Sequence, residues 1–383
     1  MEELDTMEEF EFQKEWALKQ FNEMDSDVAV ELLKNAMKKG DSLQKLLRDR
    51  WLAARELAQA LIEKGIIKVG NVDPKLSELY REALAIGIDS SRQLPCRVLS
   101  TYYAPITSAI VYFKGINCEM EYDPDSPCMF LEESNITRDE VLRKAKEEMY
   151  RCEVSAIMRA ASSISSLLRE YGERKVLVMI DGPIIDPPNT TLYDGYVKER
   201  VNAMLACKES GALVIGCVKS MEGCDFSNYL KNRQELSNLA TIAEGFGPDP
   251  QLVPFVFSAI RQMSSMLETI PMERYEPQKL ITEYMSCGLK NIYRVYLTTG
   301  GTLLCVEYFA VDREDANNIG KDVLQAVRAW SVPGQNAPLP VLAAHLRCNI
   351  RRGAAEFLYR ELLTRALTWE GGAEMFGPLV GGL

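Results

Sequence analysis

The sequence predicts a mixed α/β fold, and three observations lead to this prediction. Residues 176–180 form a run of five apolar residues, three of them β-branched, which is typical of a short strand buried on both faces. A helical pattern follows over 190–209, and a second apolar run covers 212–218. Strand, helix and strand at this spacing predict a parallel pair with a right-handed crossover. Strand-rich segments before and after this unit add antiparallel strands to the same sheet.

The N-terminal region is predicted to be helical. Residues 7–65 are rich in Glu, Lys, Leu and Ala at helical spacing, and Gly-Asp-Ser at 40–42 predicts a break between two or three helices. Nothing in this pattern indicates chemistry. We therefore expect residues 1–75 to form a helical region that contacts a second copy or another partner.

A strand and an antiparallel meander are predicted next. Residues 83–88 form an apolar strand that ends at Asp89-Ser90-Ser91-Arg92. Residues 97–103, 108–113 and 117–122 are also rich in strand-forming residues and are joined by short turns. These segments are expected to lie beside the first strand.

A long helix is predicted from residue 137 to residue 171, because Thr137 and Glu140 form a capping box at its start. Glu153 lies in the middle of this helix among small and apolar residues, so we expect part of the helix to be buried. Glu147 and Glu148 are alternative carboxylates on the same helix.

The C-terminal half is predicted to begin with a helical insertion over about 221–290. A hairpin over 292–309, with Gly300-Gly301 at its turn, then returns the chain to the sheet. Two further helices are expected over 313–330 and 341–366, followed by a flexible Gly-rich tail at 371–383.

Composition excludes several classes of protein. A chain of 383 residues with 47% apolar content can form a substantial core. Its 10 cysteines include no CxxC pair, which argues against a structural zinc site or a small disulfide scaffold. No apolar run approaches the roughly 20 residues of a membrane span, so we expect a cytoplasmic protein without membrane contact. The net charge of −11 argues against non-specific coating of nucleic acid, although a locally basic cleft stays compatible with it.

Acidic residues end two of the predicted strands. Asp89 and Asp181 each follow an apolar strand, and open α/β sheets place their sites at strand carboxyl ends. Glu153, and His345 on the last helix, could join them. Carboxylates this close repel each other without a cation, and a chain with one histidine must build a metal site mainly from carboxylates. This donor set favours magnesium or manganese, and two such ions about 4 Å apart can hydrolyse a phosphodiester.

The same residues also have structural interpretations. A turn Asp after a strand often caps the next helix, a lone His is often structural, and a Lys at a strand end is often solvated. For Lys219 we weigh the solvated interpretation evenly against a phosphate contact. Basic residues on the predicted last helix form a stripe that could face DNA or could balance nearby acids. The predicted DNA-binding residues are Lys219, Arg92, Arg347, Arg351 and Arg352, and Arg360 belongs to the same stripe.

Four motifs together resemble the NurA nucleases of archaea and some bacteria. Each motif is weak by itself, but all four occur in the order of that family. They are Ile86-Gly87-Ile88-Asp89-Ser90-Ser91-Arg92, Val178-Met179-Ile180-Asp181-Gly182-Pro183-Ile184, Ile215-Gly216-Cys217-Val218-Lys219-Ser220 and Pro338-Leu339-Pro340-Val341-Leu342-Ala343-Ala344-His345.

This resemblance implies a ribonuclease H-like, PIWI-like α/β domain over residues 76–370, with a mixed sheet, flanking helices and the helical insertion. It implies a DNA nuclease that uses Mn²⁺ or Mg²⁺, with two ions expected. It further implies 5′-to-3′ resection of DNA ends in double-strand break repair and homologous recombination, and it leaves endonuclease action on single strands open. The expected partners are DNA, a second copy in a homodimer and a hexameric HerA-type ATPase that translocates DNA. The implied catalytic and metal-binding residues are Asp89, Glu153, Asp181 and His345.

Two alternatives stay open at this point. One is a catalytically inactive DNA-binding subunit of the same ATPase complex, in which the carboxylates persist but the cleft only holds DNA. The other is a metal-free α/β scaffold whose Asp-Gly turns are structural.

Overall fold

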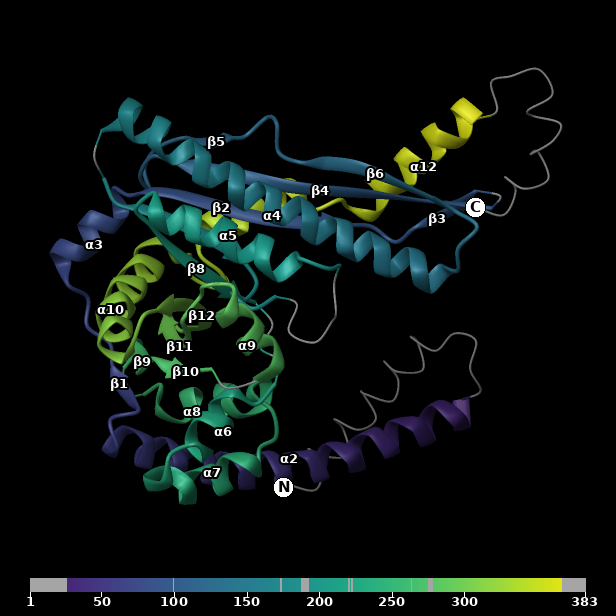
Figure 1. Ribbon diagram of the computed structural model, residues 1–383. Coiled ribbons are helices and arrows are strands. Elements are labelled where there is room, and N and C mark those ends of the chain that lie inside the picture. Colours follow the sequence, from purple (N-terminus) through teal and green to yellow (C-terminus); the bar gives the residue numbers. More distant parts are fainter. Residues whose placement is uncertain are drawn as a thin grey trace.

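The structure, a computed structural model, contains a large mixed β-sheet with helices packed on both of its faces (Figure 1). Some predicted segments lie outside the described residues. They are the first part of the predicted N-terminal helices, the start of the predicted crossover helix at Thr190, Ser220 of the third motif and the predicted tail at 371–383. The structure describes residues 26–98, 100–172, 174–186, 193–219, 221, 223–262, 264–274 and 278–366.

The described strands form one sheet. They are β1 (Ile67–Val69), β2 (Leu84–Arg92), β3 (Cys96–Val98), β4 (Thr101–Phe113), β5 (Met120–Tyr122), β6 (Cys128–Ser134), β7 (Val176–Asp181), β8 (Ala212–Val218), β9 (Leu267–Thr269), β10 (Met272–Glu273), β11 (Asn291–Thr299) and β12 (Thr302–Ala310). Their order is β1-β9-β11-β12-β8-β7-β2-β4-β3, while β5 and β6 also pair with β4 and β10 pairs with β11.

The described helices surround this sheet. None of them is both long enough and apolar enough to cross a membrane. They are α2 (Ser26–Glu63), α3 (Pro74–Arg81), α4 (Arg138–Tyr171), α5 (Tyr196–Glu209), α6 (Asp225–Lys231), α7 (Ser237–Glu244), α8 (Asp249–Ile260), α9 (Gln278–Ser286), α10 (Arg313–Trp330), α11 (Leu339–Cys348) and α12 (Arg352–Ala366).

The centre of the sheet is the predicted parallel unit. β2 is parallel to β7 and β7 is parallel to β8, and α5 connects β7 to β8 as the crossover. Alternate side chains of these strands enter opposite cores. Ile86 and Val178 pack under α4 and α5, whereas Ala85 and Met179 pack under α10 and α11. Because both faces are buried, polar side chains of these strands can reach solvent mainly at the strand ends.

Several predicted elements are confirmed. The capping box of Thr137 and Glu140 opens α4, and Glu153 is buried on that helix. The hairpin of β11 and β12 turns at Gly300 and Gly301, whose φ angles are 55° and 84°. A two-residue turn with positive φ at both positions matches the twist of the flanking strands, and glycine adopts these angles without strain.

The meander differs from the prediction in one respect. The segments predicted as separate strands at 97–103 and 108–113 are largely one strand, β4, which continues through Pro105. Pro105 lies where the β2–β4 ladder ends, since Arg92 opposite Ile106 is the last pair. There the missing N–H costs little, and the Pro105 carbonyl accepts a hydrogen bond from the Gln93 backbone N–H. The sequence analysis also missed β6, which pairs with the first half of β4.

Two helix predictions were wrong. The predicted break at residues 40–42 is absent, because α2 continues through it, and the Ser42 hydroxyl donates to the Lys38 carbonyl instead of capping a new helix. The predicted helix over 341–366 is two helices, α11 and α12, because Asn349 leaves the helical conformation with a ψ of 106°. Arg347 and Arg352 therefore do not share one helix.

The interval 221–290, predicted as a helical insertion, also contributes to the sheet. It contains α6 to α9 together with β9 and β10. β9 pairs with β1, and β10 pairs with β11. The edge of the sheet is therefore built partly from this interval and partly from the strand that follows α2.

Gly87 sets the distance between α11 and the sheet. A Cβ at this position of β2 would overlap the backbone of Pro340 in the first turn of α11. The absence of a side chain therefore lets the helix that carries His345 lie directly on the strand that carries Asp89. This close approach explains why glycine follows Ile86 in the first motif.

We expect Gly87→Ala to destabilise the protein by about 1–3 kcal/mol, because the new methyl group must push α11 away from β2. Urea denaturation of both proteins measures this difference. Gly40→Ala is the matched control, since nothing lies within 4 Å of a Cβ at Gly40 in the exposed part of α2. There the same change should stabilise the helix by about 0.5–1 kcal/mol. Equal effects at both positions would contradict this packing role of Gly87.

Candidate metal centre

Three side chains from three elements converge at the ends of the central strands. Asp89 lies on β2, Asp181 ends β7 and His345 lies on α11. One potential ligand atom from each of them lies within 4.8 Å of the other two. Asp89 is buried, with 5% of its surface exposed, while Asp181 and His345 are partly exposed. The group therefore has a covered side and an open side.

The register of the parallel strands places the two carboxylates next to each other. Ile88 pairs with Ile180, so Asp89 and Asp181 follow at the same level of adjacent strands. Side chains at matching levels of parallel neighbours point to the same face of a sheet. The proximity of the two Asp residues is thus a direct consequence of the strand pairing that the sequence predicts.

His345 reaches this pair from α11. Its Nδ1 lies 2.8 Å from Oδ2 of Asp89 and 3.8 Å from Oδ2 of Asp181. When Nδ1 carries the proton it donates to Asp89, and Nε2 then has a free lone pair. The end of α11 is fixed by the Thr107 hydroxyl, which donates to the Cys348 carbonyl at 2.6 Å. This bond and the contact at Gly87 hold the imidazole over the carboxylates.

Lys219 completes the group from the end of β8. Its Nζ donates to Oδ2 of Asp181 at 2.6 Å, and only 20% of its side chain is exposed. The solvated interpretation of this lysine is therefore wrong.

The electrostatics of the group favour a bound cation. Burial, followed by the negative charge of Asp181, raises the pKa of Asp89 to about 8. Burial and the nearby Lys219 lower the pKa of His345 below its usual value. Two carboxylates and a neutral imidazole are suitable ligands for Mn²⁺ or Mg²⁺, and a divalent ion would keep both Asp residues ionised. The residues present thus fit a divalent metal.

Glu153 lies beside this group but is engaged elsewhere. Its Oε1 accepts a hydrogen bond from Nη1 of Arg200 at 2.6 Å, and its Oε2 accepts one from the Ser90 hydroxyl at 2.8 Å. It is not among the three converging ligands. Its alternatives Glu147 and Glu148 pair with Arg143 and Arg151 on α4. The assignment of Glu153 as a third metal ligand stays a prediction.

Arg200 is a buried residue that sequence reasoning missed. Its guanidinium has no exposed surface, and besides Glu153 it donates to the carbonyl oxygens of Pro183 and Ile184 at 3.1 and 3.2 Å. It therefore joins the segment after Asp181 to the Glu153–Ser90 contact next to Asp89. The only sequence signal was an arginine among the apolar positions of the crossover helix, and arginines are common on helices.

A second buried ion pair supports the same loop from the other side. Glu307 accepts a hydrogen bond from the Ile184 backbone N–H at 2.9 Å. Arg294 donates to the other oxygen of Glu307 at 2.9 and 2.6 Å. The loop can lie on β8 because Gly216 has no side chain, since a Cβ there would meet loop backbone atoms at 2.8–3.0 Å.

The other predicted DNA-binding residues lie on separate elements near the group. Arg92 ends β2 and is partly buried. Arg347 is exposed on α11 and lies over the ring of Tyr122, 4.2 Å from its centroid. Arg351 is exposed in the link between α11 and α12, and Arg352 begins α12. Arg360 is exposed further along α12. The predicted single basic stripe of Arg347, Arg351, Arg352 and Arg360 is thus divided between two helices and the link that joins them.

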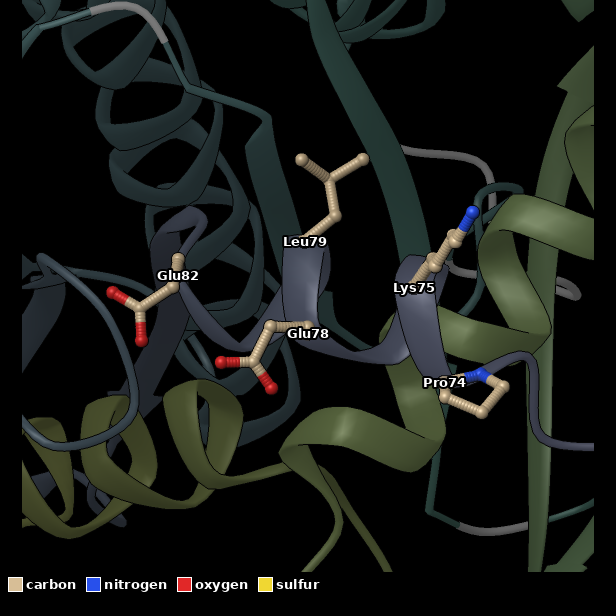
Figure 2. Close-up of a pocket in the computed structure, with 5 residues that line it drawn as sticks. All are labelled: Pro74, Lys75, Glu78, Leu79 and Glu82. Carbon is tan, nitrogen blue, oxygen red and sulfur yellow. The ribbon is translucent and has the colours of Figure 1, made fainter.

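A surface hollow on α3 does not coincide with the metal group (Figure 2). In Figure 2 the carboxylates of Glu78 and Glu82 extend toward the same side of the view, and no predicted site residue lines the hollow. It is lined by Pro74, Lys75, Glu78, Leu79 and Glu82.

The fold and the site define a mixed α/β protein whose central parallel strands end in a carboxylate–histidine group. No family model matches the chain, and no curated protein sequence matches it. Among solved structures, the catalytic domain of human endonuclease V is similar with a TM-score of 0.34 and 10% sequence identity. That alignment covers 81% of this chain and 96% of the endonuclease V chain.

We expect Arg200→Met to destabilise the fold by about 3–5 kcal/mol, because it leaves Glu153 buried without its charged partner. Chemical denaturation measures the loss. The control is Arg143→Met, which removes an exposed partner of Glu147 on α4 and should cost less than about 0.5 kcal/mol. A second substitution, Glu153→Gln, should restore part of the stability of Arg200→Met by removing the unpaired charge. A loss no larger than that of the control would contradict the structural role of Arg200.

Proposed function

We propose that the protein is a metal-dependent deoxyribonuclease that hydrolyses phosphodiester bonds. The observation that carries the proposal is the convergence of Asp89, Asp181 and His345 at the ends of the central strands, with Lys219 bonded to Asp181. A divalent ion held by this group would supply Lewis-acid polarisation of a phosphoryl oxygen and a lowered pKa for a water molecule.

The chain's own residues have separate tasks in this reaction. In hydrolysis the water oxygen forms a new bond to phosphorus, the bond from phosphorus to the leaving oxygen breaks, and the leaving oxygen gains a proton. Asp89 and Asp181 fix the position of the cation. His345, hydrogen-bonded to Asp89 through Nδ1, would join them as the third ligand, and the leaving oxygen would take its proton from a water molecule. Lys219 attracts the phosphate.

The substrate class follows from the charge of the site. The chain is acidic overall, so its attraction for a polyanion must come from local cations. Lys219 bonds to Asp181, Arg92 follows Asp89 by three residues, and Arg347 and Arg351 follow His345 by two and six residues. These positive charges support DNA as the substrate. The protein would then bind DNA mainly through phosphates close to the scissile bond and would not coat it.

The finer assignments are part of the same proposal. The antiparallel β4 beside the parallel strands β2, β7 and β8 supports a ribonuclease H-like arrangement. The remaining assignments rest on the four sequence motifs alone. They are membership of the NurA class, a preference for Mn²⁺, 5′-to-3′ resection in double-strand break repair and docking on a HerA-type ATPase.

We expect Mn²⁺ to raise the melting temperature of the wild-type protein and to support digestion of linear DNA. Asp89→Asn and Asp181→Asn should each lower the rate of digestion at least about 100-fold and abolish the thermal shift, because each removes an ionised ligand. Thermal denaturation with and without Mn²⁺, and digestion of single- and double-stranded linear DNA, measure both effects. Asp41→Asn on the exposed part of α2 is the control and should match the wild type.

The two readouts separate the alternatives. A thermal shift without digestion would support an inactive DNA-binding subunit. No thermal shift, together with equal behaviour of all four proteins, would support a metal-free scaffold. Digestion that is unchanged in the Asp89 and Asp181 variants would overturn the proposed site.

We also propose that α2 is the contact with a second copy of the chain. The C-terminal part of α2 buries Ala54, Leu57 and Leu61 against the body of the protein. The same helix face continues toward the N-terminus at three- and four-residue spacing, where Leu43 and Leu47 are 52% and 43% exposed. In Figure 1 this part of α2 extends beyond α6, α7 and α8. A helix face that is apolar along its whole length but covered along half of it supports pairing with an identical helix.

We expect the wild-type protein to have about twice the mass of the 43.1 kDa chain in solution and Leu43→Lys/Leu47→Lys to have the mass of one chain. Light scattering after size-exclusion chromatography measures both masses. Gln44→Lys adds a charge to the same turn outside the apolar stripe and should stay dimeric. A wild-type protein with the mass of a single chain would refute this proposal without affecting the nuclease assignment.

A further inference from the structure

The metal group contains few carboxylates for a site that holds two divalent ions. Within the described ranges, the converging ligands include two carboxylates, Asp89 and Asp181, and one imidazole. The nearest additional carboxylate, Glu153, already forms an ion pair with the fully buried Arg200. The negative charge available to a second cation is therefore small.

A positive charge already occupies one side of Asp181. Nζ of Lys219 is 2.6 Å from Oδ2 of Asp181, and the same oxygen is 3.8 Å from Nδ1 of His345. The ammonium group thus lies against the same carboxylate oxygen that faces His345. In two-ion sites the cations are about 3.5–4 Å apart and clamp the reacting phosphate from two sides. In this protein the ammonium group of Lys219 already lies against one of the two carboxylates that would hold the ions.

The charge balance is consistent with one ion. With both Asp residues ionised, as a bound divalent ion would keep them, the two carboxylates contribute −2 and the Lys219 ammonium +1, so these groups together carry a charge of about −1. One divalent ion changes this to about +1, which a single phosphodiester neutralises. A second divalent ion would leave an excess of about two positive charges around the bound phosphodiester.

We propose that Lys219 takes the place of a second metal ion, so that the centre holds one divalent cation and the Lys219 ammonium contacts a non-bridging oxygen of the scissile phosphate. This inference rests on the proposed nuclease function and revises its expectation of two ions. Lys219 is then a catalytic residue, because its charge acts on the phosphate as negative charge develops during hydrolysis.

The position of Lys219 is fixed by the sheet. Cys217 pairs with Asp181 across the parallel strands β7 and β8, and Lys219 follows two residues later. Two residues of extended chain return the side chain to the same face, so Lys219 reaches Asp181 from the next strand. An ammonium held in this way is a compact point charge that needs no binding step of its own.

The test measures how many ions each chain binds, by electron paramagnetic resonance of Mn²⁺ with and without deoxyadenosine monophosphate as a phosphate probe. We expect one Mn²⁺ per chain in both cases.

We expect Lys219→Met to bind Mn²⁺ about 10-fold more tightly, since it removes a competing positive charge from Asp181. The same variant should cleave DNA about 100-fold or more slowly. Lys219→Arg should keep the wild-type Mn²⁺ affinity and recover part of the activity, and Lys321→Met, at an exposed position of α10, should match the wild type.

Two Mn²⁺ per chain in the wild type would overturn the inference, and so would weaker Mn²⁺ binding or undiminished cleavage in Lys219→Met. Wild-type protein that binds Mn²⁺ but does not cleave DNA would overturn the nuclease assignment and with it the catalytic role of Lys219. Cleavage by a wild-type protein that binds two ions would leave the nuclease assignment intact and remove only the metal-replacing role of Lys219.

Discussion

Repulsion between two carboxylates at the ends of adjacent parallel strands is the constraint on which the rest of the site depends. Strand pairing alone brings Asp89 level with Asp181, and burial of Asp89 makes the repulsion more costly because water cannot screen it. Lys219 bonds to Asp181 from the end of β8, and His345 bonds to Asp89 from α11. β8 and α11 thus supply hydrogen-bond donors and positive charge next to the negative charge of Asp89 and Asp181.

Buried arginines fix the backbone around these acids. Arg200 and Arg294 are almost completely buried, and their ion pairs with Glu153 and Glu307 hold the loop after Asp181 from opposite sides. Buried ion pairs add little net stability, because removing charges from water costs nearly as much as pairing them returns. Their value in this protein is geometric. They hold a loop rigidly where an apolar side chain could not satisfy the carbonyl and N–H groups of residues 183 and 184.

The sequence predicted those parts of the site that depend on local pattern. Asp89 and Asp181 follow apolar strands, and that position is visible without any tertiary contact. Arg200, by contrast, becomes important only because α5 packs against α4 and the loop, which no spacing in the sequence reveals. The same distinction between local pattern and tertiary contact explains the two wrong helix predictions. Gly40 resembles a helix break, yet α2 continues through it, whereas the end of α11 at Asn349 depends on contacts with β2 and β4. Lys219 is an intermediate case. Its position after β8 could be predicted from the sequence, but its hydrogen bond to Asp181 could not.

A fixed ammonium and an exchangeable metal ion differ in when their charge is present. The charge of Lys219 is in place as soon as the sheet folds, since β8 holds it beside Asp181. It therefore weakens the attraction of the group for a metal ion but also attracts a phosphate before any ion arrives. In the proposed nuclease, phosphate and metal would then favour each other's binding, because the negative phosphate would offset the lysine that opposes the metal. The ion would be held most firmly when the substrate is present, which would link metal occupancy to substrate binding.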